Sequence, residues 1–336
     1  MNVVMVTGAS GFLGIHILER LMADGHQVRA FVRTPSKLRD HLALLGVEPD
    51  HPRVDVVPGD MTDPAVVREA ASGCDHVIHA AATFSYRRRD AERMLHENAA
   101  GTTTVLDAAI AAGCAGIVHV SSTVALLRPG ATLDHQSPLG VALGPYTRSK
   151  VESERVARNR QENGAPVAIV NPGGILGPHD PYLGESNEVI AEILRGRLPT
   201  WPRGCLQWVD VRDVAQVVVA ALTRPGGRYL VPGENVTLPH QPLRTVTGRR
   251  LPALRLPVKA ALPVLHLGYA TGLSFLPHAV EGSRVIAMDA RVDHTATVAD
   301  LGISGRGLSE SLGDTVRWLV QAGHISPRNA GRCLTA

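Results

Sequence analysis

The sequence is poor in aromatic residues and in cysteine. Aromatic side chains make up 4% of its 336 residues, and the only cysteines are Cys74, Cys114, Cys205 and Cys333. No two of them have the spacing of a CxxC pair or of zinc ligands, so the sequence indicates neither a disulfide framework nor a metal site. A chain of this length buries a substantial core without cross-links. We therefore expect free thiols in a globular protein.

The sequence also lacks a strong charge of either sign. It carries 34 basic and 31 acidic residues, a net charge of +3, whereas nucleic-acid binding usually needs a concentrated basic face. The densest basic run, Arg87-Arg88-Arg89, is interpreted as a solvated segment. No signal-peptide pattern precedes the first strand, and the apolar stretch 260–277, with His266 and two prolines, is marginal for a bilayer span. We expect a cytoplasmic protein with no nucleic-acid partner and no membrane span.

Hydrophobic patterning predicts an α/β fold. Short apolar, β-branched runs alternate with longer Ala-rich segments of helical period, which is typical of a Rossmann-like, doubly wound parallel sheet. The expected strands are 2–7, 27–32, 54–57, 76–80, 116–121 and 167–171, and the expected helices are 12–23, 64–71, 91–112 and 146–163.

The pattern changes after Asn171. Pro172-Gly173-Gly174 and Gly177-Pro178 interrupt it, and beyond them we expect helices at 188–195, 211–223 and 308–321 and a strand at 228–231. We predict two domains. The larger one comprises 1–172 together with 207–231, and a smaller, mostly C-terminal one comprises 173–206 and 232–336.

A glycine-rich turn joins the first strand to the first helix. It reads Thr7-Gly8-Ala9-Ser10-Gly11-Phe12-Leu13-Gly14. In this strand–turn–helix context, Gly8 permits the tight turn, Gly11 lets a pyrophosphate approach the backbone, and Gly14 allows close packing of the helix on the sheet. The helix N-terminus adds N–H donors for the phosphates. The turn predicts a dinucleotide site that includes Ser10, Phe12 and Leu13.

No acidic residue follows the second strand. An NAD site usually has a carboxylate there for the ribose hydroxyls, but this sequence has Arg33 and Thr34, with Lys37 close behind. The planar guanidinium of Arg33 suits a 2′-phosphate. We therefore predict that NADP(H) is preferred, with Arg33 and Lys37 as binding residues. The alternatives are that Arg33 is merely exposed and that NAD(H) is also used.

A tyrosine and a lysine lie four residues apart at the start of an expected helix. The i, i+4 spacing places Tyr146 and Lys150 on one helix face. A nearby ammonium favours phenolate, so Lys150 is expected to lower the pKa of Tyr146. Ser122 follows an apolar strand and is expected to orient a substrate carbonyl, with Thr123 as second candidate; Ser121 is assigned to the cofactor. These residues predict acid–base catalysis.

The sequence resembles the extended short-chain dehydrogenase/reductases, the NAD-dependent epimerase/dehydratase family. The motifs that carry the resemblance follow one another in the family's order: the glycine-rich turn, Ser122 and Tyr146-x-x-x-Lys150. The segments 79–86, 170–178, 209–214 and 233–238 are most similar to its dihydroflavonol reductase-like branch. The resemblance implies roles for further residues. Asp60 and Met61 would flank the adenine; Ala80, Ala81, Ala82, Tyr146, Lys150, Pro172 and Gly173 would contact the cofactor; and Asn98 would belong to the catalytic set. The family also often forms dimers, and helices 91–112 and 146–163 are the candidates for a homodimer interface.

The smaller domain is expected to cover a small-molecule substrate. Its candidate contacts are Thr83, Tyr86, Ser122 and Tyr182, with His179, Trp201 and Trp208 as further lining residues, and 260–277 is either a lid or ordinary packing. The predicted function is NADP(H)-dependent reduction of a ketone or aldehyde to an alcohol. Three alternatives stay open: an NAD-dependent nucleotide-sugar epimerase or dehydratase, a 3β-hydroxysteroid dehydrogenase-like enzyme, and a non-catalytic NADP-sensing regulator.

Overall fold

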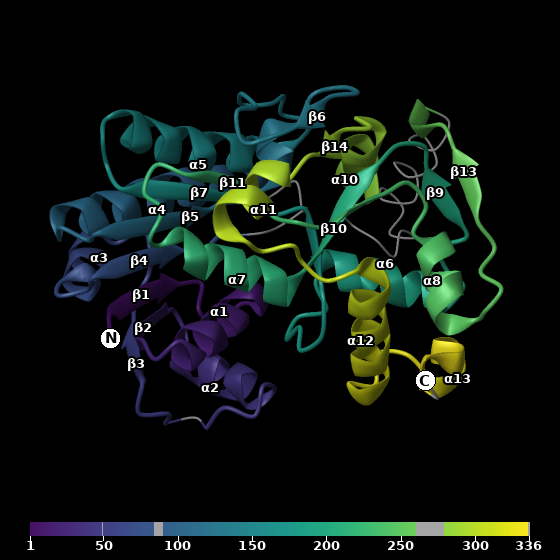
Figure 1. Cartoon of the computed structure of the whole chain (residues 1–336), viewed down its shortest axis with the longest axis horizontal. Coiled ribbons are helices and arrows are strands. Elements are labelled where there is room, and N and C mark those ends of the chain that lie inside the picture. The colour runs from purple at the N-terminus through teal and green to yellow at the C-terminus, as the bar shows by residue number, and fades with distance from the viewer. Residues whose placement is uncertain (49, 84–89, 260–278, 335–336) are drawn as a thin grey trace.

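A seven-stranded, fully parallel sheet forms the centre of the computed structural model, which describes residues 1–48, 50–83, 90–259 and 279–334 (Figure 1). Its strand order is β11-β7-β5-β4-β1-β2-β3, and the order therefore reverses between β1 and β4. The strands are β1 (Val3–Thr7), β2 (Gln27–Val32), β3 (Val54–Pro58), β4 (His76–His79), β5 (Gly116–Val120), β7 (Val167–Asn171) and β11 (Arg228–Leu230). The carboxyl ends of strands at such a reversal form the usual binding crevice of this architecture.

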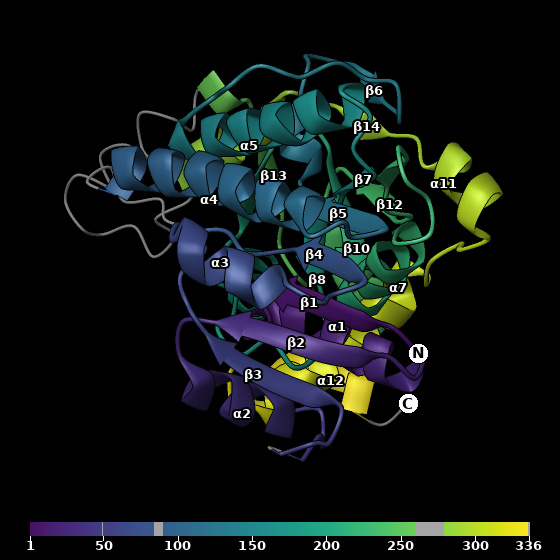
Figure 2. The same cartoon turned by 90° about the vertical axis from the view of Figure 1, so that its left-hand side faces the viewer.

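Helices cover both faces of the sheet because alternate strand residues point to opposite sides. Val4 and Val6 of β1 belong to one core, shared with α1 (Phe12–Ala23), α2 (Pro35–Ala43) and α7 (Val211–Ala221). Met5, between them, belongs to the other, shared with α3 (Pro64–Ala71), α4 (Ala91–Ala111) and α5 (Pro145–Glu162). Figure 2 shows α3, α4 and α5 along one side of the sheet. The predicted doubly wound α/β fold is confirmed.

Most expected elements agree with the structure to within one residue. β2, β7, α1, α3 and α12 (Leu308–Gln321) match their predicted bounds, whereas α6 (Glu185–Leu194) begins three residues before the expected 188. Helix α2 was not expected, because only its Leu38 and Leu42 are buried and its hydrophobic pattern is therefore short.

The chain after residue 171 forms a second core with small sheets. β8 (Gly174–Leu176), β10 (Leu206–Asp210) and β12 (Glu234–Val236) make one sheet, β9 (Thr200–Pro202) pairs with β13 (Leu254–Leu256), and β14 (Arg291–Val292) pairs with β6 (Thr132–Leu133). The described residues of this part of the chain also form the helices α8 (His240–Thr247), α10 (Ala279–Ala287), α11 (Thr295–Leu301) and α13 (Pro327–Ala330). Trp201, Trp208 and Trp318 pack in this second core with α6, α8 and α12. Strand β10 pairs with β8 and β12, whereas β11 joins the large sheet and α7 packs on it. The proposed domain boundaries stay a prediction.

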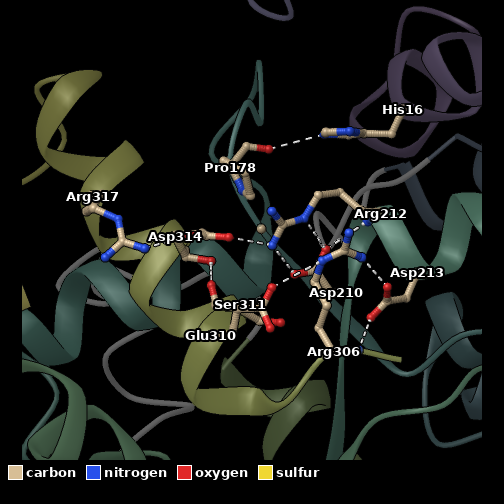
Figure 3. A network of polar contacts seen from close by, with 12 residues as sticks. His16, Pro178, Asp210, Arg212, Asp213, Arg306, Glu310, Ser311, Asp314 and Arg317 are labelled. Carbon is tan, nitrogen blue, oxygen red and sulfur yellow. Dashed lines mark hydrogen bonds and ion pairs between the residues drawn. The ribbon is translucent and has the colours of Figure 1, made fainter. Parts of the chain in front are cut away.

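A network of ion pairs fastens α12 and the segment before it to α7 (Figure 3). Asp210 caps α7, accepting from the Arg212 backbone N–H at 2.9 Å, and the Arg212 guanidinium bridges Asp210 and Asp314 of α12 at 2.7 Å each. Asp213, which is 2% exposed, accepts from the backbone N–H of Arg306 at 2.6 Å and pairs with its guanidinium. These contacts hold the second core against the helices of the large sheet.

The described residues contain no helix with both the length and the apolarity needed to cross a bilayer. The four cysteines are buried and form no disulfide with one another. The predicted lid or packing segment 260–277, Arg87-Arg88-Arg89 and Tyr86 lie outside the described residues.

Candidate active site

The turn between β1 and α1 is packed so tightly that only glycine fits. Gly8 has φ +73°, and a Cβ there would lie 2.7 Å from the backbone nitrogen of Ala81. A Cβ on Gly14 would lie 2.1 Å from the carbonyl oxygen of Gly8. The strand, the turn and the helix therefore approach one another as closely as a dinucleotide-binding turn requires.

A cleft of about 780 Å³ opens above this turn, a size within the range of small-molecule and cofactor sites. The predicted cofactor residues along it are Gly8, Ser10, Gly11, Phe12, Arg33, Lys37, Asp60, Met61, Ala80, Ala81 and Ala82. Leu13 packs instead against the core, and Gly14 serves the packing of α1. The glycine cradle and the cleft fit a nicotinamide dinucleotide.

One end of the cleft is basic and partly covered from the second half of the chain. Arg33 and Lys37 line it, and Tyr182 reaches it from the loop before α6, with its ring 5.1 Å from that of His41 in an edge-on arrangement. Burial raises the pKa of Tyr182, and the nearby Arg33 lowers it in part. Tyr182 and Thr83, both assigned to the substrate from sequence, are thus placed along the cofactor cleft, and their substrate role stays a prediction.

Ser122 and Tyr146 meet at the end of β5. Ser122 caps the short 3₁₀ helix Thr123–Leu126 by accepting from the Val124 N–H at 3.3 Å, and its hydroxyl donates to Pro172 O at 3.4 Å. Ser122 and Tyr146 line the same pocket, and the Ser122 side chain lowers the pKa of the Tyr146 phenol. Tyr146 lies in the first turn of α5, which places Lys150 one turn further along. The structure thus brings the predicted hydroxyl pair together.

An apolar pocket of about 180 Å³ adjoins this hydroxyl pair. Ser122, Thr123, Tyr146 and Gly173 form one side of it. The hydrophobic wall consists of Val189, Leu198, Trp201, Pro202, Leu206, Trp208, Leu256, Val285 and Ile286. The lining therefore includes the predicted Trp201 and Trp208, and it also holds two carboxylates, Glu185 and Glu281. Among the described lining residues there is no lysine or arginine.

The prediction that the pKa of Tyr146 is lowered is wrong, because in the described structure this pKa is raised. Burial raises the pKa of the Tyr146 phenol well above its usual value, the carboxylates of Glu185 and Glu281 raise it further, and only the Ser122 hydrogen bond lowers it. Burial also lowers the pKa of Lys150 to about 8, although Glu154 partly offsets this effect. Two neighbouring carboxylates and the low dielectric therefore keep Tyr146 protonated.

A fully buried glutamate, Glu154, lies on helix α5 one turn after Lys150. Glu154 of α5 accepts hydrogen bonds from Ser121 Oγ and Asn171 Nδ2, both at 2.6 Å, and from Arg158 Nε at 2.9 Å. It ties α5 to the ends of β5 and β7, and its negative charge raises the pKa of Lys150 in part. Ser121, assigned to the cofactor from sequence, is held in this network.

Asn98 lies on α4 and is 4% exposed. Its side-chain oxygen accepts from Thr83 N at 2.7 Å, and its amide nitrogen donates to Thr83 O at 2.9 Å and to Ser149 Oγ at 3.3 Å. It therefore fixes the irregular segment that follows β4 at the edge of the cofactor cleft. Its catalytic role stays a prediction.

Sequence reasoning missed three acidic residues of the site. Glu154 could have been found, because it lies four residues after Lys150 and thus on the same helix face. Glu185 and Glu281 had no such signal, since α6 and α10 reach Tyr146 only through the tertiary fold.

Comparisons with known proteins agree with this geometry. A sequence model described as the NAD dependent epimerase/dehydratase family matches residues 4–231. The chain is 32% identical to a Synechocystis protein named as a dihydroflavonol 4-reductase, over 95% of each chain. It is 30% identical to the sterol demethylase protein B of Methylococcus capsulatus, over 96% of this chain and 99% of that one. The crystal structure of gox2253 superposes with a TM-score of 0.80 at 28% identity, covering 97% of this chain and all of that one. The chain belongs to the NAD dependent epimerase/dehydratase family and is an NAD(P)-dependent short-chain dehydrogenase/reductase.

Proposed function

We propose that this enzyme uses NADPH to reduce an uncharged, hydrophobic ketone or aldehyde to an alcohol. The observation that carries the proposal is that the hydroxyl groups of Ser122 and Tyr146 border one apolar pocket, next to the cleft of the glycine cradle. The relatives named as a dihydroflavonol reductase and a sterol demethylase protein support a substrate with a large apolar surface.

The residues of the cleft would hold the cofactor at its two ends. The Gly8–Gly11 turn and the N-terminus of α1 offer N–H groups to the pyrophosphate, and Arg33 and Lys37 offer cations to a 2′-phosphate. Lys150 would hold the ribose near the nicotinamide. When bound, NADPH supplies the hydride for the carbonyl carbon.

Tyr146 acts as the general acid in this proposal. Its raised pKa keeps the phenol protonated at neutral pH, so that Oη carries a proton to give to the carbonyl oxygen. The Ser122 hydroxyl holds the same oxygen. The products would be the alcohol, the oxidised cofactor and a tyrosinate, which takes up a proton from solvent to restore the phenol.

The pocket favours neutral substrates over nucleotide sugars. A nucleoside diphosphate needs cations, but the described lining offers two carboxylates, Glu185 and Glu281, and no basic residue. Trp201 is 5% exposed, and its indole Nε1 has no hydrogen-bond partner in the described structure. Because a buried donor is costly to leave unpaired, an oxygen atom on the substrate suits this wall.

Turnover with NADPH tests the proposal. NADPH oxidation is followed at 340 nm with dihydroquercetin, androstenedione and cinnamaldehyde as uncharged carbonyl probes and with a UDP-sugar as the charged comparison. We expect turnover of at least one uncharged probe, lost in Tyr146→Phe, while NADPH binding measured by fluorescence is kept. Unchanged turnover in Tyr146→Phe would refute the catalytic assignment. Arg33→Ala should weaken NADPH binding and spare NADH; equal loss of both cofactors would refute the 2′-phosphate site.

A further inference from the structure

The helix that carries Tyr146 caps itself only in part. Thr147 Oγ1 accepts from Leu143 N at 2.8 Å and from Gly144 N at 3.0 Å, but no side chain at the N-cap position accepts from the first N–H groups of the helix. Its N-cap residue is Gly144, which has no side chain, and its first residue is Pro145, which has no N–H. A helix normally satisfies the next two N–H groups with a Ser, Thr, Asp or Asn side chain at the N-cap position. In α5 these groups belong to Tyr146 and Thr147, the second and third residues of the helix.

Glu281 of α10 supplies the missing acceptor. Its Oε1 accepts from Thr147 N at 2.8 Å and its Oε2 accepts from Tyr146 N at 3.4 Å. Glu281 and Thr147 are 134 residues apart in the sequence. The side chain is 9% exposed. Arg284, one turn later in α10, donates to Leu143 O at 3.2 Å. Helix α10 therefore holds the start of α5 through both a carboxylate and a guanidinium.

Gly144 makes room for this contact. A Cβ on Gly144 would lie 2.5 Å from Cδ of Glu281, so a side chain there and the carboxylate of Glu281 exclude each other. The backbone at Gly144 is extended, with φ −173°, a conformation that any residue adopts. The glycine is thus needed for space rather than for its conformation, and it leaves room for an acceptor that comes from α10.

The carboxylate of Glu281 also borders the proposed substrate pocket. Glu281 lines the apolar pocket together with Tyr146 and Ser122. Burial raises the pKa of Tyr146 most, and the charges of Glu185 and then Glu281 add to that rise. A negative charge at a helix N-terminus is also favourable to the helix dipole. Glu281 thus contacts the backbone of the proton donor and borders the space where the substrate would lie.

We propose that Glu281 is a positioning residue of the reaction. By capping α5 from α10, it fixes the first helical turn and thereby aims the Tyr146 hydroxyl at Ser122 and the pocket. The C-terminal part of the chain, which builds the substrate pocket, thus also completes the catalytic constellation of the large sheet. This inference rests on the proposed role of Tyr146 as proton donor.

Four variants test the inference. Glu281→Ala removes the cap, and Glu281→Ala combined with Gly144→Ser returns one from within α5, because the space taken by the carboxylate is then empty. Glu152→Gln, a partly exposed acid of α5 paired with Arg155 at 3.2 Å, is the matched control. Tyr146→Phe reports whether Tyr146 is the proton donor at all. The measurements are kcat and KM with the best ketone probe, NADPH affinity by fluorescence, and amide hydrogen exchange of the first turn of α5.

Glu281→Ala should lower kcat about tenfold or more, leave NADPH affinity unchanged, and speed exchange at Thr147. The double variant should recover most of kcat and the slow exchange. The pH profile of alcohol oxidation should move to lower pH in both, because neither restores the charge that raises the pKa of Tyr146. Glu152→Gln should behave as wild type.

Two results would overturn the inference. One is a kcat in Glu281→Ala within twofold of wild type, and the other is a folded double variant with slow exchange at Thr147 but no recovery of kcat. If Glu281→Ala does not fold, the double variant alone decides, since its kcat then has to approach the wild-type value. Full turnover in Tyr146→Phe would instead refute the proposed function, and the two failures are therefore distinguishable.

Discussion

Lys150, which the proposed function places beside the nicotinamide ribose, gives a test of burial and charge. Its replacement should stabilise the cofactor-free protein and abolish turnover. Burial lowers the pKa of Lys150 from its usual 10.5 to about 8, even with Glu154 nearby. A difference of this size means that folding disfavours the ammonium by about 3 kcal/mol. In Lys150→Met that penalty disappears, while Glu154 keeps its bonds to Ser121, Asn171 and Arg158.

The gain should depend on pH in a defined direction. Because the folded pKa lies below the unfolded one, the unfolded chain binds more protons between pH 8 and 10.5, and wild-type stability rises with pH across that window. The advantage of Lys150→Met should therefore be largest, up to about 3 kcal/mol, at pH 7. It should shrink steadily as the pH rises above 8.

Urea unfolding followed by tryptophan fluorescence, at several pH values between 7 and 10, measures this difference. Lys259→Met is the matched control, because it makes the same substitution at an exposed position. A Lys150→Met protein that is less stable than wild type at pH 7, or whose advantage is the same at every pH, would refute the reasoning.

Other substitutions test the packing of the scaffold. Gly14→Ala places a methyl group 2.1 Å from the Gly8 carbonyl oxygen and should destabilise the fold by about 3 kcal/mol and abolish NADPH binding, as urea unfolding and fluorescence titration will show. Asp213→Asn leaves Arg306 without its buried partner and should lower the free energy of unfolding by about 2 kcal/mol, less than for a fully buried pair because Arg306 is 33% exposed. Asp63→Ala removes the cap of α3, which accepts from Ala65 N at 3.0 Å, and should lower the free energy of unfolding by about 1 kcal/mol. For each of the three variants, an unchanged urea midpoint would contradict the importance of the contact that it removes or disturbs.

The elements that sequence predicted best are those whose own residues specify them. Helix α3 matches residue for residue because Asp63 caps it, Pro64 starts it, and Val67, Ala70 and Ala71 form its buried face. Strand β7 is a fully buried run, and in β2 the apolar Val28, Ala30, Phe31 and Val32 are buried. By contrast, β8, β9, β13 and β14 have two or three residues each, too few for an alternating pattern, and they exist only because tertiary packing brings partners together.

The same distinction applies to the site. Gly8, Gly11 and Gly14 were predictable because each meets a local constraint of one turn, and Tyr146 and Lys150 because one helix places them. The electrostatics of Tyr146 was not predictable, because Glu185 and Glu281 arrive from α6 and α10. Sequence spacing showed the cation near Tyr146 but neither of the two anions, and the expected direction of its pKa was therefore wrong.

In the proposed mechanism, with Tyr146 as the proton donor, the raised pKa of its phenol bears on the direction of catalysis. A phenol kept protonated by burial and by two carboxylates is ready to give up a proton, so carbonyl reduction can begin without prior ionisation. Alcohol oxidation has to begin from the phenolate, and this site disfavours phenolate unless further positive charge enters it. The oxidised nicotinamide ring carries such a charge and the reduced ring does not. The protein alone therefore prepares the reductive step, whereas the oxidative step depends on the charge of the bound cofactor, and its rate should rise with pH while that of reduction stays level near neutrality.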